Sequence, residues 1–195
     1  FNNFQYDDSV KEKNRAEDIT RVLYPNDIQR PGKVLRLKQQ YFFCSASIQD
    51  IIEKYEKNFP NDKDFEDFAK YNTIQLNDTH PVMAIPEMMR VLMDDKKLSW
   101  KQAWNVTSNV FNYTNHTILQ EAMEKWSVDV VEEVSPRIMD IIAEIDRRFV
   151  SDLVGLYYSV DRIDNLRIVK DNTVNMAHLA ILTAVKINGV AKIHT

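Results

Sequence analysis

The clearest helical periodicity in the chain lies between Lys33 and Phe59, where apolar residues return every three or four positions. They are Leu37, Tyr41, Cys44, Ile48, Ile51 or Ile52, and Tyr55. This spacing gathers apolar side chains on one face of a helix and leaves the other face polar. We therefore predict one long amphipathic helix over residues 33–59.

Two short apolar segments, at 73–77 and 111–114, predict buried strands. After the first strand and its polar loop, a helix is expected over 86–95 with a proline in its first turn. A further helix is expected over 99–110, where the serine at its start and Gln102 form a capping box. Strand, polar loop and helix in succession predict an α/β fold with a parallel sheet.

The remainder of the chain continues this alternation of helices and strands. We expect a helix over 119–126, and then a long helix or a broken pair of helices over 127–156 around Pro136. The pattern indicates one compact, helix-rich unit. Its last expected elements are a strand over 166–170, a helix over 173–185 and a strand over 186–194.

Polar side chains follow two of the expected strands. Asp78 and His80 come after the first strand, and His116 comes after the second. In open parallel sheets, ligands bind beyond the carboxyl ends of the strands, so these loops are expected to meet at one crevice. Asp78 and His80 could form a sugar hydroxyl network, a general acid and base pair or two metal ligands, or an Asx turn beside an incidental histidine. His116 could equally be a loop histidine whose hydrogen bonds are satisfied.

Several other residues are expected to serve structure rather than chemistry. His178 lies on an apolar helix and is expected to be a core histidine. Cys44 is the only cysteine, so no intramolecular disulfide can form and a buried structural thiol is expected. Aromatic residues at helical positions are expected to pack in the core, and they are Tyr41, Phe42, Phe43, Trp100, Trp104 and Trp126.

Composition excludes several classes of function. The formal net charge of -4 comes from interspersed acids and bases, so no basic stripe indicates a nucleic acid partner. No apolar run approaches the ~20 residues that cross a bilayer, so no membrane insertion is expected. Gly32, Gly155 and Gly189 are the only glycines, and they are too scattered for a Walker loop or a GxGxxG turn. A phosphate site is therefore expected elsewhere, and both ends of the chain have the appearance of cuts.

Long residue strings add information that spacing alone does not. The most unusual are Gln75-Leu-Asn-Asp-Thr-His-Pro81 and Tyr113-Thr-Asn-His-Thr117. Others are Leu23-Tyr-Pro-Asn-Asp27, Gly32-Lys33, Leu35-Arg-Leu-Lys-Gln-Gln-Tyr41, Ala84-Ile-Pro-Glu87, Glu121-Ala122, Pro136-Arg137 and Asn188-Gly-Val-Ala191. In this order along almost the whole chain, the strings resemble the glycogen and maltodextrin (α-glucan) phosphorylase family.

The resemblance implies that residues 1–195 form the second half of a Rossmann-like, GT-B type N-terminal domain. The full enzyme of this family uses orthophosphate to release glucose 1-phosphate from α-1,4-glucan ends with retained configuration. Its pyridoxal phosphate is held by a lysine of the C-terminal domain, so this chain is expected to bind no cofactor and no metal and to be inactive alone. The resemblance also implies a cytoplasmic homodimer, and it leaves the preference for glycogen, starch or maltodextrin open.

Carried over by position, the resemblance assigns binding and orienting roles. His116 matches the histidine that hydrogen-bonds the glucose 6-hydroxyl and whose main-chain carbonyl lies beside the reacting anomeric carbon. Asp78 and His80 match the pair that supports this sugar pocket, and Asp27 lies in the loop that gates it. Ile28 stands where the family commonly has an asparagine that reaches the glucose, and its side chain can neither donate nor accept a hydrogen bond.

Two further departures from the family concern regulation and storage. Glu53–Lys54 stand where nucleotide-regulated animal enzymes carry two arginines for the activator's phosphate, so activation by AMP is not expected. Asp140, Ala143 and Asp146 replace side chains of the glycogen storage site, so no surface anchor for glycogen is expected. The residues alone also leave open a free-standing carbohydrate-binding module and a metal hydrolase built on the strand-end residues.

Overall fold

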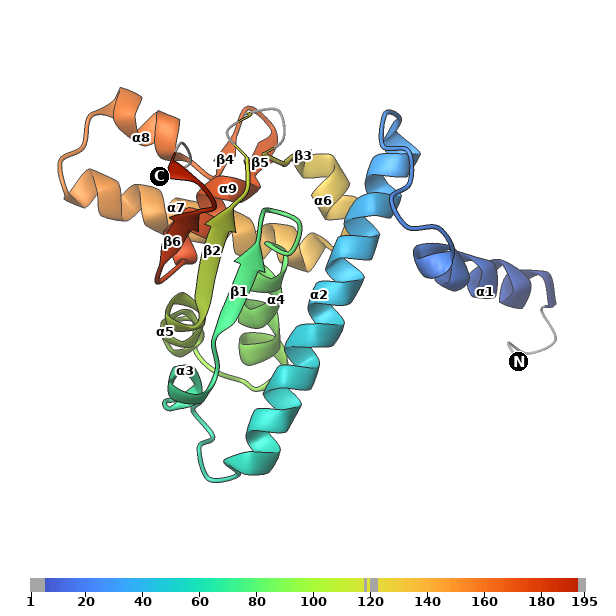
Figure 1. The fold of residues 1–195 in the computed structure, drawn as a ribbon, viewed down its shortest axis with the longest axis horizontal. Coiled ribbons are helices and arrows are strands. Elements are labelled where there is room, and N and C mark those ends of the chain that lie inside the picture. Colours follow the sequence, from blue (N-terminus) through green and yellow to red (C-terminus); the bar gives the residue numbers. More distant parts are fainter. Residues whose placement is uncertain (1–5, 118, 120–122, 193–195) are drawn as a thin grey trace.

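The computed structural model describes residues 6–117, 119 and 123–192. A small parallel sheet lies within the body of the protein, with helices beside it (Figure 1). Its strands are β1 (Ile74–Asn77), β2 (Phe111–Asn115) and β6 (Ile187–Gly189), in the spatial order β1-β2-β6. Both neighbouring pairs run parallel, which confirms the predicted α/β class.

The longest helix, α2, runs along one side of the body (Figure 1). It spans Arg30–Asn58, so it begins slightly earlier than expected, with Pro31 in its first turn. Proline favours this position because its fixed φ suits a helix and the N–H that it lacks would have no partner there. The predicted apolar stripe is buried at Leu37, Cys44 and Ile48, and α2 packs against α4 (Ala84–Arg90).

The helices that connect β1 to β2 also follow the prediction. A π-helical segment, η1 (Val91–Asp95), continues α4, and α5 spans Trp100–Val110. The Ser99 Oγ accepts a hydrogen bond from the Gln102 main chain, while the Gln102 side chain accepts one from the Ser99 main chain. This reciprocal pair is the predicted capping box, and it satisfies two N–H groups at the start of α5.

A broken pair of helices follows, as the position of Pro136 predicts. α6 spans Val128–Val134 and α7 spans Pro136–Gly155, with Ser135 in an extended conformation between them. Proline disfavours helical geometry in the residue before it, so α6 ends and a new helix begins. The Ser135 hydroxyl then caps α7 by accepting a hydrogen bond from the main chain of Ile138.

The prediction of a helix over 119–126 is wrong at the C-terminal end of that range. The strand β3 (Lys125–Ser127) lies there instead and pairs antiparallel with β5 (Thr173–Asn175). Trp126 is buried opposite Val174, and packing of an aromatic against a β-branched residue across two strands favours this arrangement over a helix. Residues 118 and 120–122 of the expected helix lie outside the described residues.

A hairpin also shortens the helix expected over 173–185. β4 (Val169–Lys170) and β5 are joined by Asp171 and Asn172, whose φ angles are 49° and 56°. Positive φ at both central residues is the pattern of a type I′ turn, which Asp and Asn tolerate. The helix α9 (Met176–Thr183) therefore begins only after the hairpin, and the strand expected over 166–170 is reduced to β4.

Three short or isolated helices complete the described chain. α3 (Phe68–Tyr71) and α8 (Val160–Leu166) were not expected from the sequence pattern. α1 (Tyr6–Arg21) contains no buried residue and extends away from the body (Figure 1). Within the described residues, none of the helices is both long and apolar enough to cross a membrane.

Candidate functional site at the strand ends

The polar loops that follow β1 and β2 are joined where the two strands end. Asn77, the last residue of β1, lies in register with Thr114 of β2. The main-chain N–H of Asp78 then donates to the Thr114 carbonyl over 2.9 Å. The structure thus places the residues that follow the two strands side by side, at the edge where ligands bind in open parallel sheets.

Asp78 has a left-handed conformation, with φ at 65°, and is half-buried. Aspartate tolerates this region better than most residues because its short side chain can hydrogen-bond locally. Its Oδ1 accepts from the main-chain N–H of Thr79 over 2.8 Å, so the carboxylate is held within its own turn. This bond reaches the next residue rather than the one two positions on, so it is not the Asx turn that the sequence left open, but it does orient the carboxylate of Asp78.

The two histidines occupy different surroundings. His80 is exposed and lines a cavity of about 240 Å³ together with Tyr24, Arg36 and Gln40. His116 is exposed and follows the last residue of β2 directly. Across the described part of the chain, no three His, Cys, Asp or Glu side chains are grouped closely enough to hold a metal ion.

Asp27 lies in a loop that is held against the first turns of α2. A Cβ atom on Gly32 would lie 1.7 Å from the carbonyl oxygen of Asn26, so only glycine allows the loop to approach the helix this closely. The Asp27 Oδ2 accepts from Arg36 Nη1 over 2.8 Å. Ile28 is 81% exposed, and its main-chain N–H donates to the Asn26 side chain.

Sequence reasoning missed the residues that link this loop to the strand ends. Arg36 of α2 bridges the carboxylates of Asp27 and Glu124, and Glu124 in turn lies within hydrogen-bond distance of Thr79. The side chain of Glu124 is only 10% exposed. Its segment carries no periodic signal that distinguishes it from a surface glutamate, because its partners lie far away in the sequence.

Tyr113 of β2 lies close enough to Asp78 for the charge of that carboxylate to act on its phenol. Its side chain is buried, and its hydroxyl has no hydrogen-bond partner among the described residues. Burial, followed by the negative charge of Asp78, raises the pKa of Tyr113 to about 12. The phenol is therefore neutral at physiological pH.

Other expectations from the sequence have mixed outcomes. Cys44 is buried, as expected. His178 is half-buried, with its Nδ1 2.8 Å from the Arg167 carbonyl oxygen. Core packing is wrong for Phe42 and Phe43, which are 47% and 51% exposed. Both side chains lie outside the buried stripe of α2, so an aromatic residue in a helix is not necessarily buried.

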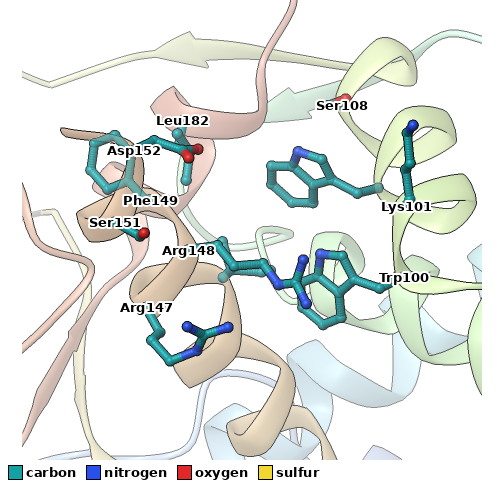
Figure 2. A pocket seen from close by; sticks show the side chains of 11 residues that line it. Trp100, Lys101, Ser108, Arg147, Arg148, Phe149, Ser151, Asp152 and Leu182 are labelled. Carbon is teal, nitrogen blue, oxygen red and sulfur yellow. The ribbon is translucent and has the colours of Figure 1, made fainter. Parts of the chain in front are cut away.

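Trp100 and Trp104 pack against the core, as expected, but only part of each side chain is buried. They also line a hollow of about 610 Å³ between α5 and α7. Figure 2 shows Arg148 reaching from α7 toward Trp100, and its guanidinium carbon lies 4.6 Å from the ring centroid. This cation–π contact ties α5 to α7.

Asp146, which the resemblance places among the replaced residues of the storage site, is buried. Its Oδ2 accepts from both Nε and Nη2 of Arg167, and its Oδ1 accepts from the main chains of Ile168 and Val169. The residue therefore connects α7 to the segment before the β4–β5 hairpin and has a structural role.

Comparison with known proteins identifies the family. The family described as Carbohydrate phosphorylase matches residues 1–195. The chain belongs to this phosphorylase family. Glycogen phosphorylase 2 of Dictyostelium discoideum is 48% identical over 200 residues, which cover 100% of this chain and 20% of that protein. The α-glucan phosphorylase H isozyme of Vicia faba is 46% identical, and human liver glycogen phosphorylase is 45% identical, each matched over 100% of this chain and 24% of its own length.

The resemblance to phosphorylases read from the sequence is thus confirmed along the whole chain. The chain spans about a quarter or less of the length of these phosphorylase relatives. The residues present do not fit the pyridoxal phosphate that the family implies. None of the described lysines is buried, as a Schiff-base lysine protected from water would be, and no glycine-rich turn is available to cradle a phosphate.

Proposed function

We propose that this chain acts as part of an α-glucan phosphorylase, in which it forms one wall of the crevice that holds the terminal glucose. The family match over residues 1–195 supports this proposal. The chain would correspond to the second half of the N-terminal domain, and by itself it would be inactive. In the complete enzyme, pyridoxal phosphate would be held by a lysine of the C-terminal domain rather than by this chain, and it would supply acid and base chemistry through its phosphate group.

In the proposed reaction, the bond between the anomeric carbon of the terminal glucose and the glycosidic oxygen breaks. Orthophosphate forms the new bond to that carbon on the same face from which the glycosidic oxygen leaves, so the configuration is retained in glucose 1-phosphate, and a proton from the orthophosphate ends on the oxygen of the shortened glucan. The transition state carries positive charge at the anomeric carbon. Preorganised dipoles that face such a charge stabilise it without reorganisation.

His116 would orient the glucose by a hydrogen bond to the 6-hydroxyl, and its main-chain carbonyl would stabilise the cationic transition state. The position of His116 directly after β2, at the carboxyl edge of the sheet, supports this role. Asp78 and His80 would support the sugar pocket. The hydrogen bond of 2.8 Å from the Thr79 main chain holds the Asp78 carboxylate in one orientation, which supports a positioning role for it.

Asp27 would help to control access to the crevice, because its loop is tied to α2 by Arg36. Ile28, with an exposed apolar side chain, offers no side-chain hydrogen bond to glucose. Substrate contact from this loop would therefore be made through its main chain or through Asp27.

We further propose that the complete enzyme is a cytoplasmic homodimer. The matching α-glucan phosphorylase 2 of Arabidopsis thaliana is described as cytosolic, and it is 44% identical over 202 residues. α1, which has no buried residue, offers a helix for a subunit contact. Light scattering of the purified complete enzyme would test the dimer directly.

The assay for this function measures phosphorolysis by the complete polypeptide that contains this chain. Maltoheptaose and glycogen are supplied separately with orthophosphate, and glucose 1-phosphate is measured. We expect glucose 1-phosphate to form only when both glucan and orthophosphate are present. Release of free glucose without orthophosphate would instead identify a hydrolase and would overturn the proposal.

A further inference from the structure

The carboxylate of Glu124 is surrounded by hydrogen-bond donors from two separate parts of the chain. Its Oε1 accepts from Arg36 Nη2 over 3.0 Å and from Gln40 Nε2 over 2.9 Å, both from α2. Its Oε2 lies 3.4 Å from the Thr79 hydroxyl, in the loop after β1. Only 10% of the Glu124 side chain is exposed, so these contacts form in a largely desolvated place where charge-assisted hydrogen bonds are strong.

The main chain at Glu124 is held as well. Its N–H lies 3.4 Å from the Thr79 hydroxyl oxygen, and its carbonyl accepts from the first main-chain N–H of α9, at Met176, over 3.2 Å. The backbone of Glu124 is thus fixed between the loop after β1 and the start of α9. A carboxylate on a fixed backbone gives its partners a fixed point of attachment.

Arg36 links the carboxylate of Glu124 to the Asp27 loop. Its Nη2 binds Glu124, while its Nη1 donates to Asp27 Oδ2 over 2.8 Å. A guanidinium is planar and rigid, so binding one nitrogen sets the direction in which the other points. The Arg36 side chain is 26% exposed and that of Asp27 is 43% exposed, so the outer bond of the chain is the one closer to solvent.

We propose that Glu124 is a positioning residue that, through Arg36, holds the Asp27 loop at a set place relative to Asp78 and Thr79. The inference rests on the proposed function, because it assigns Glu124 to the site where the glucan would bind. Arg36 and Gln40 line the same cavity as His80, so the network borders a further residue of that site. It connects the Asp27 loop, α2 and the loop after β1 into one unit.

The positive charge of Arg36 favours a carboxylate at position 124. Arg36 and Gln40 present N–H groups that can only donate, and both point at the same oxygen of Glu124. A glutamine at this position could still offer one oxygen to Arg36 and Gln40, with its NH2 facing the Thr79 hydroxyl, but it would lose the negative charge. Glu124→Gln therefore preserves the shape of the side chain and removes the charge from its interaction with Arg36.

The test uses the complete enzyme and compares Glu124→Gln, Asp27→Asn, the double variant and Arg36→Lys. Arg36→Lys keeps the positive charge but lacks the fork that can bind two carboxylates, so it reports on the same link if Glu124→Gln fails to fold. Asp94→Asn is the matched control. Asp94 forms a two-bond ion pair with Arg137, with distances of 2.8 and 2.7 Å, and shares no residue with the Glu124 network.

We expect Glu124→Gln to lower kcat/KM for maltoheptaose by about 10- to 100-fold, the range for losing a charge-assisted hydrogen bond. The effect should lie mainly in KM, since the loop would contribute to holding the glucan. The double variant with Asp27→Asn should lose little more than the worse single variant, because both changes break one linkage. Asp94→Asn should leave kcat/KM unchanged. Additive losses from Glu124→Gln and Asp27→Asn, or an unchanged KM in Glu124→Gln, would overturn the inference.

A second measurement separates this inference from the proposed function. Hydrogen exchange of the main-chain amides of residues 22–28 should be faster in Glu124→Gln and Arg36→Lys than in the wild type, and unchanged in Asp94→Asn. Equal exchange in all four proteins would show that Glu124 does not hold the loop, whether or not the wild type is a phosphorylase. A wild type that forms no glucose 1-phosphate, yet shows faster exchange in the two variants, would overturn the proposed function and the site assignment while leaving the mechanical link established.

Discussion

The main-chain N–H of Asp78 donates to the carbonyl of Thr114 over 2.9 Å, immediately beyond the end of β1. This hydrogen bond completes the parallel pairing of Asn77 with Thr114 at the end of β1 and β2, although Asp78 itself has already left the strand conformation with φ at 65°. The polar loops that begin at Asp78 and after Asn115 therefore start from a shared anchor. Their relative position is set by the sheet rather than by the loops themselves.

The left-handed conformation of Asp78 predicts a specific order of stability among substitutions. Asp78→Ala should lower the free energy of unfolding by about 1 to 3 kcal/mol, because alanine is strained at positive φ and cannot accept from Thr79. Asp78→Asn should lose less than half as much, since asparagine tolerates this conformation and keeps an acceptor oxygen. Urea unfolding of the three proteins measures both changes. Equal losses for alanine and asparagine would contradict this interpretation of the turn.

Gly32 and Gly155 both lie in helices but should respond to alanine in opposite directions. Gly32→Ala should lower the free energy of unfolding by about 1 to 3 kcal/mol, because its Cβ would clash with the Asn26 carbonyl. Gly155→Ala should raise it by up to ~1 kcal/mol, because nothing lies within 4 Å of the new Cβ and alanine favours the helix. The pair is compared by thermal and urea unfolding. A stabilised Gly32→Ala protein would show that the Asp27 loop does not pack on α2.

Replacing Asp146 with alanine should destabilise the protein far more than replacing Asp140, which lies on the same helix. Asp146→Ala should lower the free energy of unfolding by about 2 to 4 kcal/mol, because it leaves Arg167 and two main-chain N–H groups without their acceptor. Asp140 is exposed, so Asp140→Ala should change stability by less than ~0.5 kcal/mol. Denaturant unfolding of both variants checks the difference, and similar losses at the two positions would refute the structural role.

Cys44 should be unreactive in the folded protein. Burial, followed by a smaller effect of the nearby Glu87 charge, raises the pKa of its thiol to about 12. The thiol is also buried on α2, with Sγ 3.4 Å from the Pro81 carbonyl oxygen, so reagents cannot reach it and little thiolate forms. We expect labelling by a thiol reagent at pH 8 to occur only after denaturant is added. Rapid labelling of the native protein would contradict the burial of Cys44.

Local and periodic signals predicted much of this fold. The apolar stripe of α2 and the capping box of α5 depend on neighbours within a few positions, so the sequence reveals them directly. The end of the helix expected over 119–126 was wrong because Trp126 is stabilised by a strand partner about fifty residues away, which no local pattern reveals. The turn at Asp171–Asn172 did carry a local signal, two residues suited to positive φ, which the apolar periodicity after it obscured.

The candidate site could also be predicted only in part from the sequence. Asp78 and His116 could be placed together because parallel strands bring their carboxyl ends to one edge, which is a rule of topology. Glu124 and Arg36 could not, because they meet through tertiary packing across 88 positions of sequence. The roles assigned to Asp27, Asp78, His80 and His116 come from the family resemblance, and they stay predictions until the complete enzyme is assayed.

The effect of His116→Ala on phosphorolysis by the complete enzyme decides whether the crevice beyond β1 and β2 holds the reacting sugar. His116 is exposed beyond β2, so its loss should leave the thermal midpoint unchanged. Loss of its hydrogen bond to glucose should lower kcat/KM by about 5- to 150-fold, equivalent to roughly 1 to 3 kcal/mol. An enzyme that keeps the wild-type kcat/KM for maltoheptaose after His116→Ala would show that the crevice beyond β1 and β2 does not hold the reacting sugar.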